Sequence, residues 1–189
     1  MIMFRAATQS LAGVVVLFAG VTLGNAAWKP DISIDRPELK FVMISRSSEQ
    51  MQAFYEGRGF PADKAREVSS ACFLTTGVDN LTRDTLWMDL SQWEFRDRHG
   101  RVLTHRGRDQ WKQHWKQLGL KQAHISTFNW TVMPQERDLF PDEHIGSNIT
   151  LVRSGNDMNP VTLTARFPLG KDKSGGPVIV KVENIQCLD

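Results

Sequence analysis

The chain has 189 residues, of which 41% are hydrophobic and 23% are charged, and its formal net charge at pH 7 is +2. This length suits one domain with a substantial hydrophobic core and leaves little room for two. The sequence contains no internal repeat and no low-complexity tract, which excludes solenoid repeats and low-complexity linker proteins.

Residues 1–26 have the layout of a secretory signal peptide. One basic residue precedes an apolar run from Leu11 to Leu23, and small residues follow the run where a signal peptidase would cut. An uncleaved anchor is the alternative, but the run is shorter than the ~20 residues that a membrane-spanning helix needs. We therefore expect a signal peptide over 1–26 and a single exported domain over 27–189. This domain would be periplasmic or secreted, with no stable membrane insertion after cleavage.

Both cysteines, Cys72 and Cys187, lie in the part of the chain that we expect to be exported. An even number of cysteines in an oxidising compartment favours a disulfide. A thiol nucleophile is the weaker interpretation, because no histidine lies near either cysteine in the sequence. We therefore predict a Cys72–Cys187 disulfide.

The first part of the exported domain, residues 27–70, is predicted to hold an extended lead-in, a strand and a helical pair. The strand is LKFVMIS, residues 39–45. Ser47 and Gln50 then match a capping box, which predicts the start of the first helix. Pro61 opens a second short helix, because its missing N–H costs nothing in the first turn.

From residue 71 to residue 189 the pattern changes to short β runs. They are rich in Val, Ile, Thr, Phe and Trp, and turn-forming residues separate most of them. The predicted strands are CFLTTGV, TLWMDLSQWEF, RVLTH, HISTFNWTVM, HIGSNITLV, VTLTARF and VIVKVENIQCL. The chain is thus predicted to be mainly β, an antiparallel immunoglobulin-like β-sandwich over 71–189 with the N-terminal helical pair and one inserted helix over 109–118.

Residues 128–167 resemble bacterial immunoglobulin-like modules. An aromatic strand, FNWTVMP, is followed by a loop that ends in DLFPDEH and then by alternating strands that include VTLTARF. The resemblance implies the fold alone, because this fold hosts many unrelated functions.

The inserted helix places its large residues on one face. Trp111, His114, Trp115 and Leu118 recur at i, i+3, i+4 and i+7, while lysines and glutamines occupy the other faces. A helix this short has no stability of its own, so burial of this face against the sandwich is the leading interpretation. The alternative is an exposed binding face built on the two tryptophans.

A basic segment surrounds this helix. Residues 96–121 hold eight basic and two acidic side chains, an excess of six, whereas the whole chain has a net charge of only +2. Such segregated charge suits an anionic partner, although a solvated rim without a partner is the alternative. We expect another extracytoplasmic protein or an anionic envelope component, and not nucleic acid, which is foreign to that compartment. The predicted binding residues are Arg101, Arg106, Arg108, Trp111, Lys112 and Trp115.

No motif in the chain specifies a reaction. The sequence has no Gly-x-Ser-x-Gly elbow, no phosphate-binding glycine loop, no Cys-x-x-Cys-His and no His-Glu-x-x-His. We therefore expect a non-catalytic binding or accessory module, with no catalytic residue, no metal ligand and no cofactor. An enzyme with a carboxylate site assembled from distant strands is one alternative.

A copper or other metal carrier is the second alternative. The run PDEHIGSNITL resembles the histidine-containing strand of periplasmic copper chaperones with a cupredoxin-like fold. That resemblance implies copper ligation by His144 and methionines. This chain departs from the family, since Ile145 and Gly146 stand where a methionine would be near and no histidine follows His144. The methionines available to such a site are Met43, Met88, Met133 and Met158.

Overall fold

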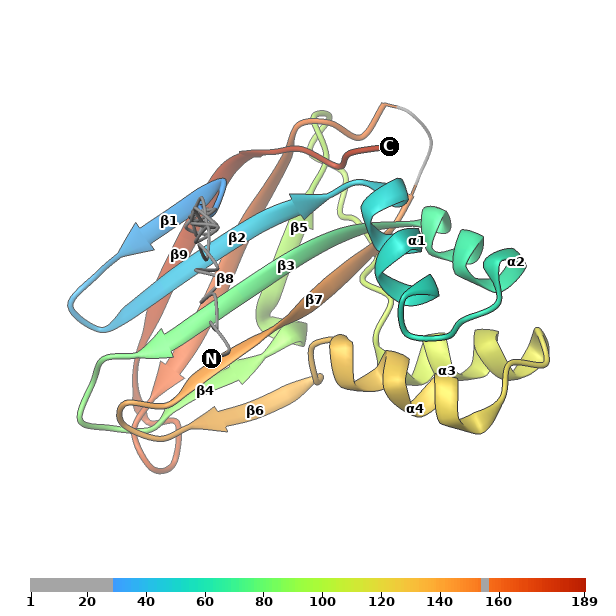
Figure 1. Cartoon of the computed structure of the whole chain (residues 1–189). Helices are drawn as coiled ribbons and strands as arrows, with labels where there is room; N and C mark the ends of the chain where they lie inside the picture. Colours follow the sequence, from blue (N-terminus) through green and yellow to red (C-terminus); the bar gives the residue numbers. More distant parts are fainter. Residues whose placement is uncertain (1–28, 154–156) are drawn as a thin grey trace, which may run out of the picture.

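The computed structural model describes residues 29–153 and 157–189, so the signal peptide expected over 1–26 lies outside the described residues. The described chain is mainly β, as predicted, and forms two antiparallel sheets (Figure 1). Sheet A has the strand order β1-β2-β3-β7. Its strands are β1 (Ile32–Asp35), β2 (Leu39–Arg46), β3 (Ala71–Asn80) and β7 (His144–Val152).

Sheet B is organised around β8, which pairs with β9, β5 and β4. The short strand β4 pairs in turn with β6. A 3-10 turn at Leu90–Gln92 separates β4 from β5, within a run that the sequence predicts as one strand. The strands of this sheet are β4 (Leu86–Asp89), β5 (Trp93–Arg96), β6 (Glu136–Leu139), β8 (Val161–Leu169) and β9 (Gly175–Ile185).

The main core lies between the two sheets, because their strands turn alternate residues inward. In β8, the period-two pattern is confirmed by the burial of Val161, Leu163 and Phe167. Trp93 of sheet B contacts Phe41 of sheet A, with the ring centroids 6.0 Å apart. Residues of both sheets thus belong to one continuous cluster that holds the layers face to face.

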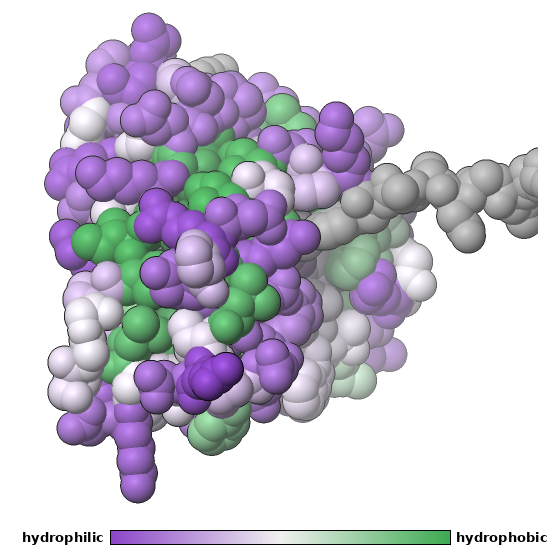
Figure 2. Space-filling model, turned by 90° about the vertical axis from the view of Figure 1, so that its left-hand side faces the viewer, coloured by the Kyte–Doolittle hydropathy of each residue, from purple (hydrophilic) through white to green (hydrophobic). Residues whose placement is uncertain are grey.

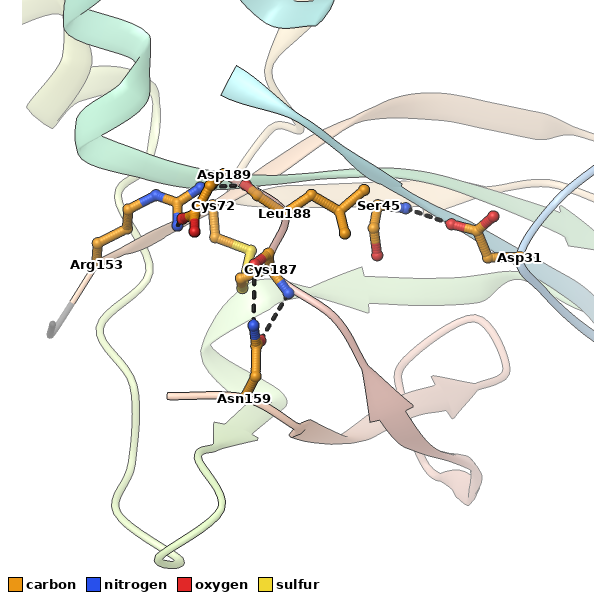
Figure 3. The surroundings of a disulfide bond; sticks show 8 residues. All are labelled: Asp31, Ser45, Cys72, Arg153, Asn159, Cys187, Leu188 and Asp189. Atoms are coloured by element: carbon orange, nitrogen blue, oxygen red, sulfur yellow. Dashed lines mark hydrogen bonds and ion pairs between the residues drawn. A yellow bond between two sulfur atoms is a disulfide. The ribbon is translucent and has the colours of Figure 1, made fainter. Parts of the chain in front are cut away.

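The predicted Cys72–Cys187 disulfide is confirmed (Figure 3). Cys72 lies in β3 and Cys187 lies just beyond β9, so the bond joins sheet A to the segment that follows the last strand of sheet B. The Asn159 side chain accepts a hydrogen bond from the Cys187 N–H at 2.7 Å and donates one to the Cys187 carbonyl at 3.0 Å. The C-terminal segment is therefore fixed by both a covalent bond and a side-chain amide.

Four α-helices gather at one end of the two sheets, at the right in Figure 1. The first, α1 (Ser48–Glu56), begins at the predicted capping box: Ser47 Oγ accepts from the Gln50 N–H at 3.1 Å, and Gln50 Oε1 accepts from the Ser47 N–H at 3.2 Å. The others are α2 (Ala62–Ala65), which continues into a 3-10 turn (Arg66–Ser70), α3 (Arg108–Gln117) and α4 (Gln122–Thr131).

A second core lies between these helices and the face of sheet A that points away from sheet B. Its centre is a set of five buried rings, which we call the aromatic cluster: Tyr55, Phe73, Trp111, Trp115 and Phe128. Phe128 contacts each of the other four, with centroid distances between 4.8 and 6.5 Å. This one ring therefore connects three helices to the sheet.

One predicted strand, HISTFNWTVM, is wrong: these residues form most of α4, so two helices are inserted and not one. The prediction relied on the β-branched and aromatic content of the run. Its buried residues within α4, Ile125 and Phe128, follow instead the i, i+3 spacing of a helix, and buried Val132 is the C-cap. Packing of this stripe on the second core outweighs the modest helix propensity of the run.

Smaller boundaries also differ from the predictions. The inserted helix α3 starts at Arg108, because Gly107 is its N-cap and the Gln110 side chain accepts a hydrogen bond from the Gly107 N–H at 2.8 Å. The predicted strand RVLTH makes only isolated bridges, and β6 lies where the sequence predicts a loop. These changes leave the two-sheet arrangement intact.

Replacement of both cysteines, Cys72→Ser with Cys187→Ser, should lower the free energy of unfolding by about 4 kcal/mol. The bond joins residues 115 positions apart in the sequence, so it restricts a long loop of the unfolded chain. Urea denaturation of the parent and the variant measures the difference, and thiol titration of the denatured parent should find no free thiol. Equal stability of the two proteins would contradict the expectation.

Candidate binding surface around Trp130

The structure buries the two tryptophans that were predicted to bind a partner. Trp111 and Trp115 are both 0% exposed, and their rings stack with centroids 5.3 Å apart. Trp111 Nε1 donates to Thr150 Oγ1 at 2.8 Å, so its polar atom is also satisfied. The packing interpretation of this helix face is confirmed. The assignment of Trp111 and Trp115 as binding residues is corrected, because side chains without exposed area offer a partner no surface.

Arg101 and Arg106 are engaged within the protein. Arg101 Nε donates to the buried Asp97 carboxylate at 2.6 Å across the predicted hairpin turn. Burial by itself raises the pKa of Asp97, but hydrogen bonds from Arg101 and a neighbouring backbone N–H outweigh it and hold the pKa below its usual value. Arg106 donates to Ser70 Oγ at 3.1 Å and lies 4.7 Å from the Trp111 ring centroid.

Arg108 and Lys112 line a cleft of about 270 Å³ between α3 and α4, which we call the helix cleft. The Arg108 Nε donates to the Val132 carbonyl at 2.7 Å, which fixes the guanidinium group. Burial lowers the pKa of Arg108, although a guanidinium stays protonated at neutral pH. Every charged residue in the lining is basic. The lining consists of Arg108, Lys112, Gln122, Ser126, Asn129 and Trp130.

A larger groove of about 670 Å³ also has Trp130 in its lining, and we call it the sheet groove. Its floor is the outer face of sheet A, and its walls are α1 and the C-terminal end of α4. Its one charged lining residue is again basic. The sheet groove is lined by Arg46, Gln50, Met51, Ala53, Phe54, Thr75, Trp130, Thr131, Gly146, Ser147 and Asn148.

A row of hydrogen bonds crosses the floor of the sheet groove. Arg46 Nε donates to Thr75 Oγ1 at 3.0 Å, and the Thr75 hydroxyl donates to Asn148 Oδ1 at 2.7 Å. Beside this row, Gly146 and Gly77 are register partners, and a Cβ added to Gly77 would approach a valine methyl carbon to 2.8 Å. The floor therefore presents polar atoms in fixed positions and little side-chain bulk.

Trp130 belongs to both clefts and is 82% exposed, more than any other large hydrophobic residue in the described ranges. Trp130 is not among the predicted binding residues, because a strand would place Phe128 and Trp130, two residues apart, on the same face. On a helix, two residues are separated by roughly 200° of rotation. Phe128 can then enter the core only if Trp130 points away from it. A helical interpretation of this run would have found the exposed tryptophan.

The structure does not bring the proposed metal ligands together. His144 lies at the start of β7 and pairs through Nδ1 with Asp79 on the neighbouring β3. Within residues 29–153 and 157–189, no three histidine, cysteine or acidic side chains gather closely enough to hold a metal ion. The methionines lie in the core between the sheets: Met43, Met88, Met133 and Met158.

No protein-family model and no curated protein matches the chain. Among solved structures, it is similar to the yjhA protein from Bacillus subtilis, with a TM-score of 0.48 and 10% identity over 85% of this chain and 98% of that chain. It is also similar to the ycdA protein from Bacillus subtilis subsp. subtilis str. 168, with a TM-score of 0.42 and 10% identity over 80% and 38% of the two chains. Neither likeness indicates a function. Across the described part of the chain, none of the helices has the length and apolar character of a membrane span.

The accessibility of individual tryptophans to acrylamide can test this arrangement. The fluorescence that disappears in a Trp130→Phe variant should be strongly quenched, because this indole is 82% exposed. The fluorescence that disappears in a Trp115→Phe variant should be weakly quenched, because that indole is buried. Difference emission spectra against the parent protein isolate the two contributions. A shielded Trp130 contribution would contradict the described surface.

Proposed function

We propose that the protein is an exported, non-catalytic binding or accessory module that recognises another extracytoplasmic protein or an anionic envelope component. Its binding surface is the Trp130 surface, by which we mean the sheet groove and the helix cleft together with the tryptophan that they share. The observation that carries the proposal is the 82% exposure of Trp130 between two clefts whose charged lining residues are all basic.

An exposed tryptophan between clefts is a strong feature of binding surfaces. An indole exposed to water does not contribute the hydrophobic free energy that buried aromatic residues contribute to stability. Tryptophan is also among the residue types most enriched at binding hot spots. The charged lining residues Arg46, Arg108 and Lys112 are all basic, which favours an anionic partner.

The proposal retains part of the basic site that the sequence predicts. Arg108 and Lys112 belong to the helix cleft, whereas Arg101 and Arg106 support the fold through Asp97 and Ser70. The basic segment thus supplies one wall of the surface, and the rest comes from α1, α4 and sheet A.

Three observations support the extracytoplasmic location and the scaffold in this proposal. The buried Cys72–Cys187 disulfide is stable in an oxidising compartment, and residues 1–26 have the layout of a signal peptide. The immunoglobulin-like class of the sandwich is likewise proposed, supported by two antiparallel sheets around one core.

Hydrogen–deuterium exchange can test the proposed surface directly. The purified protein is mixed separately with the protein, lipid and polysaccharide fractions of the cell envelope of its source organism. At least one fraction should protect amides in three segments, 46–54, 108–112 and 129–131. A Trp130→Ala variant should need about tenfold more ligand for the same protection, because the substitution removes the proposed hot spot.

The matched control for this experiment is Phe140→Ala. Phe140 is an exposed aromatic residue, 54% exposed, that follows β6 at the end of the sheets opposite the helices. Its replacement should leave the protection unchanged. Protection confined to other segments, or no protection by any fraction, would overturn the proposed function.

A further inference from the structure

We infer that the ligand of the Trp130 surface is an acidic polysaccharide. One sugar ring of the polysaccharide lies on Trp130, and carboxylates of the polysaccharide lie beside Arg46, Arg108 and Lys112. This inference rests on the proposed function and specifies the chemical class of the partner. Three properties of the surface lead to it: an exposed indole, neutral hydrogen-bonding side chains and cations in linings that contain no acid.

The indole of Trp130 suits the apolar face of a sugar ring. A pyranose exposes several C–H groups on one side, and an aromatic face carries the negative end of the ring quadrupole. Trp130 is 82% exposed, so most of the indole surface is available to a ligand. Because this residue lines both clefts, a ring on the indole has an open path for the chain on either side.

The neutral lining residues suit sugar hydroxyl groups. Gln122, Ser126 and Asn129 line the helix cleft, and Gln50 and Asn148 line the sheet groove. Amide and hydroxyl side chains both donate and accept hydrogen bonds, as the hydroxyl groups of a sugar do. A ligand with many hydroxyl groups can therefore satisfy both linings.

The cations are held in a way that leaves donors for a ligand. Arg46 and Arg108 are each fixed through Nε, the first by Thr75 Oγ1 at 3.0 Å and the second by the Val132 carbonyl at 2.7 Å. Each guanidinium has four further N–H donors on its two terminal nitrogens, which match the two oxygens of a carboxylate. Lys112 adds a third positive charge in the helix cleft. Since neither lining contains an acid, this charge remains for an anionic ligand.

A membrane surface fits these observations less well than a glycan. Insertion into lipid needs a group of exposed apolar side chains, whereas Trp130 borders Gln122, Ser126 and Asn129 in the helix cleft. Leu81 and Phe140, two further exposed apolar residues, follow β3 and β6 at the opposite end of the sheets. Figure 2 shows that end of the molecule, where hydrophilic side chains break up the apolar patches.

A folded acidic protein is also a weaker candidate. Groove and cleft are concave, and they meet at one aromatic residue. A thin, flexible chain can enter both at once, whereas a folded protein would have to present a separate projection to each. The observations thus favour a linear polymer that combines hydroxyl groups with carboxylates.

Isothermal titration calorimetry with defined polysaccharides tests the inference. The ligands are polygalacturonate, alginate and hyaluronan, each beside a counterpart whose carboxyl groups are reduced to alcohols. At least one acidic polymer should bind and its neutral counterpart should bind about tenfold more weakly. Raising the salt concentration to about 0.5 M should also weaken the binding, because it screens the charges.

Matched variants assign the binding to the surface. Trp130→Ala should weaken the binding about tenfold, and Phe140→Ala should leave it unchanged. Lys112→Gln should weaken it about threefold, whereas Lys181→Gln, at an exposed position of β9, should have no effect. Trp130 is 82% exposed, so its replacement leaves the core intact and the comparison concerns folded protein.

The outcomes separate this inference from the proposed function. If no acidic polysaccharide binds, or if binding is insensitive to Trp130→Ala, the acidic glycan is overturned as the ligand. If anionic vesicles or an envelope protein then protect segment 129–131, the Trp130 surface is still a binding surface, but for a different partner. If no class of ligand protects this segment, both the inference and the proposed function fail.

Discussion

The candidate surface depends on the packing of one ring, Phe128, against the rest of the aromatic cluster. The helix α4 has only ten residues and no side-chain hydrogen bond at its N-cap, so it has little stability of its own. Phe128 fixes it by contacts with Tyr55, Trp115 and other rings of the cluster. Once this ring is buried, the helical period directs Trp130 outward. The exposed indole is therefore a consequence of the second core.

Strand β7 connects this second core to the floor of the sheet groove. Its alternate residues Gly146, Asn148 and Thr150 all lie on the outer face of sheet A. Thr150 is buried against Trp111, Asn148 joins the polar row of the floor, and Gly146 leaves the floor open. The other face of the strand packs into the main core, which the Cys72–Cys187 disulfide helps to hold. The main core thus holds the floor of the sheet groove in place from the inner face of sheet A.

The parts of the fold that depend on local pattern could be predicted from the sequence. The capping box at Ser47, the period-two strand β8 and the Cys72–Cys187 disulfide each follow from neighbouring residues or from cysteine number. The burial of Trp111 and Trp115 also follows from the spacing of one helix face.

The candidate surface could not be predicted in the same way, because it is assembled from segments that are distant in the sequence. Arg46, Thr75, Trp130 and Asn148 are brought together only by tertiary packing. The exposure of Trp130 is not apparent from the sequence, because the β-branched and aromatic content of residues 124–133 favours a strand over the helical spacing of Ile125 and Phe128. The basic segment is evident as a charge pattern, but its sequence does not reveal that Arg101 pairs with Asp97.

Fluorine NMR of protein labelled with 5-fluorotryptophan tests the central claim most directly, because it reports each indole separately. Single Trp→Phe variants assign the resonances of Trp130, Trp111 and Trp115. On titration with an acidic polysaccharide, the Trp130 resonance should shift and saturate, while those of the buried Trp111 and Trp115 stay in place. A saturating shift of another tryptophan with an unchanged Trp130 resonance would contradict the account.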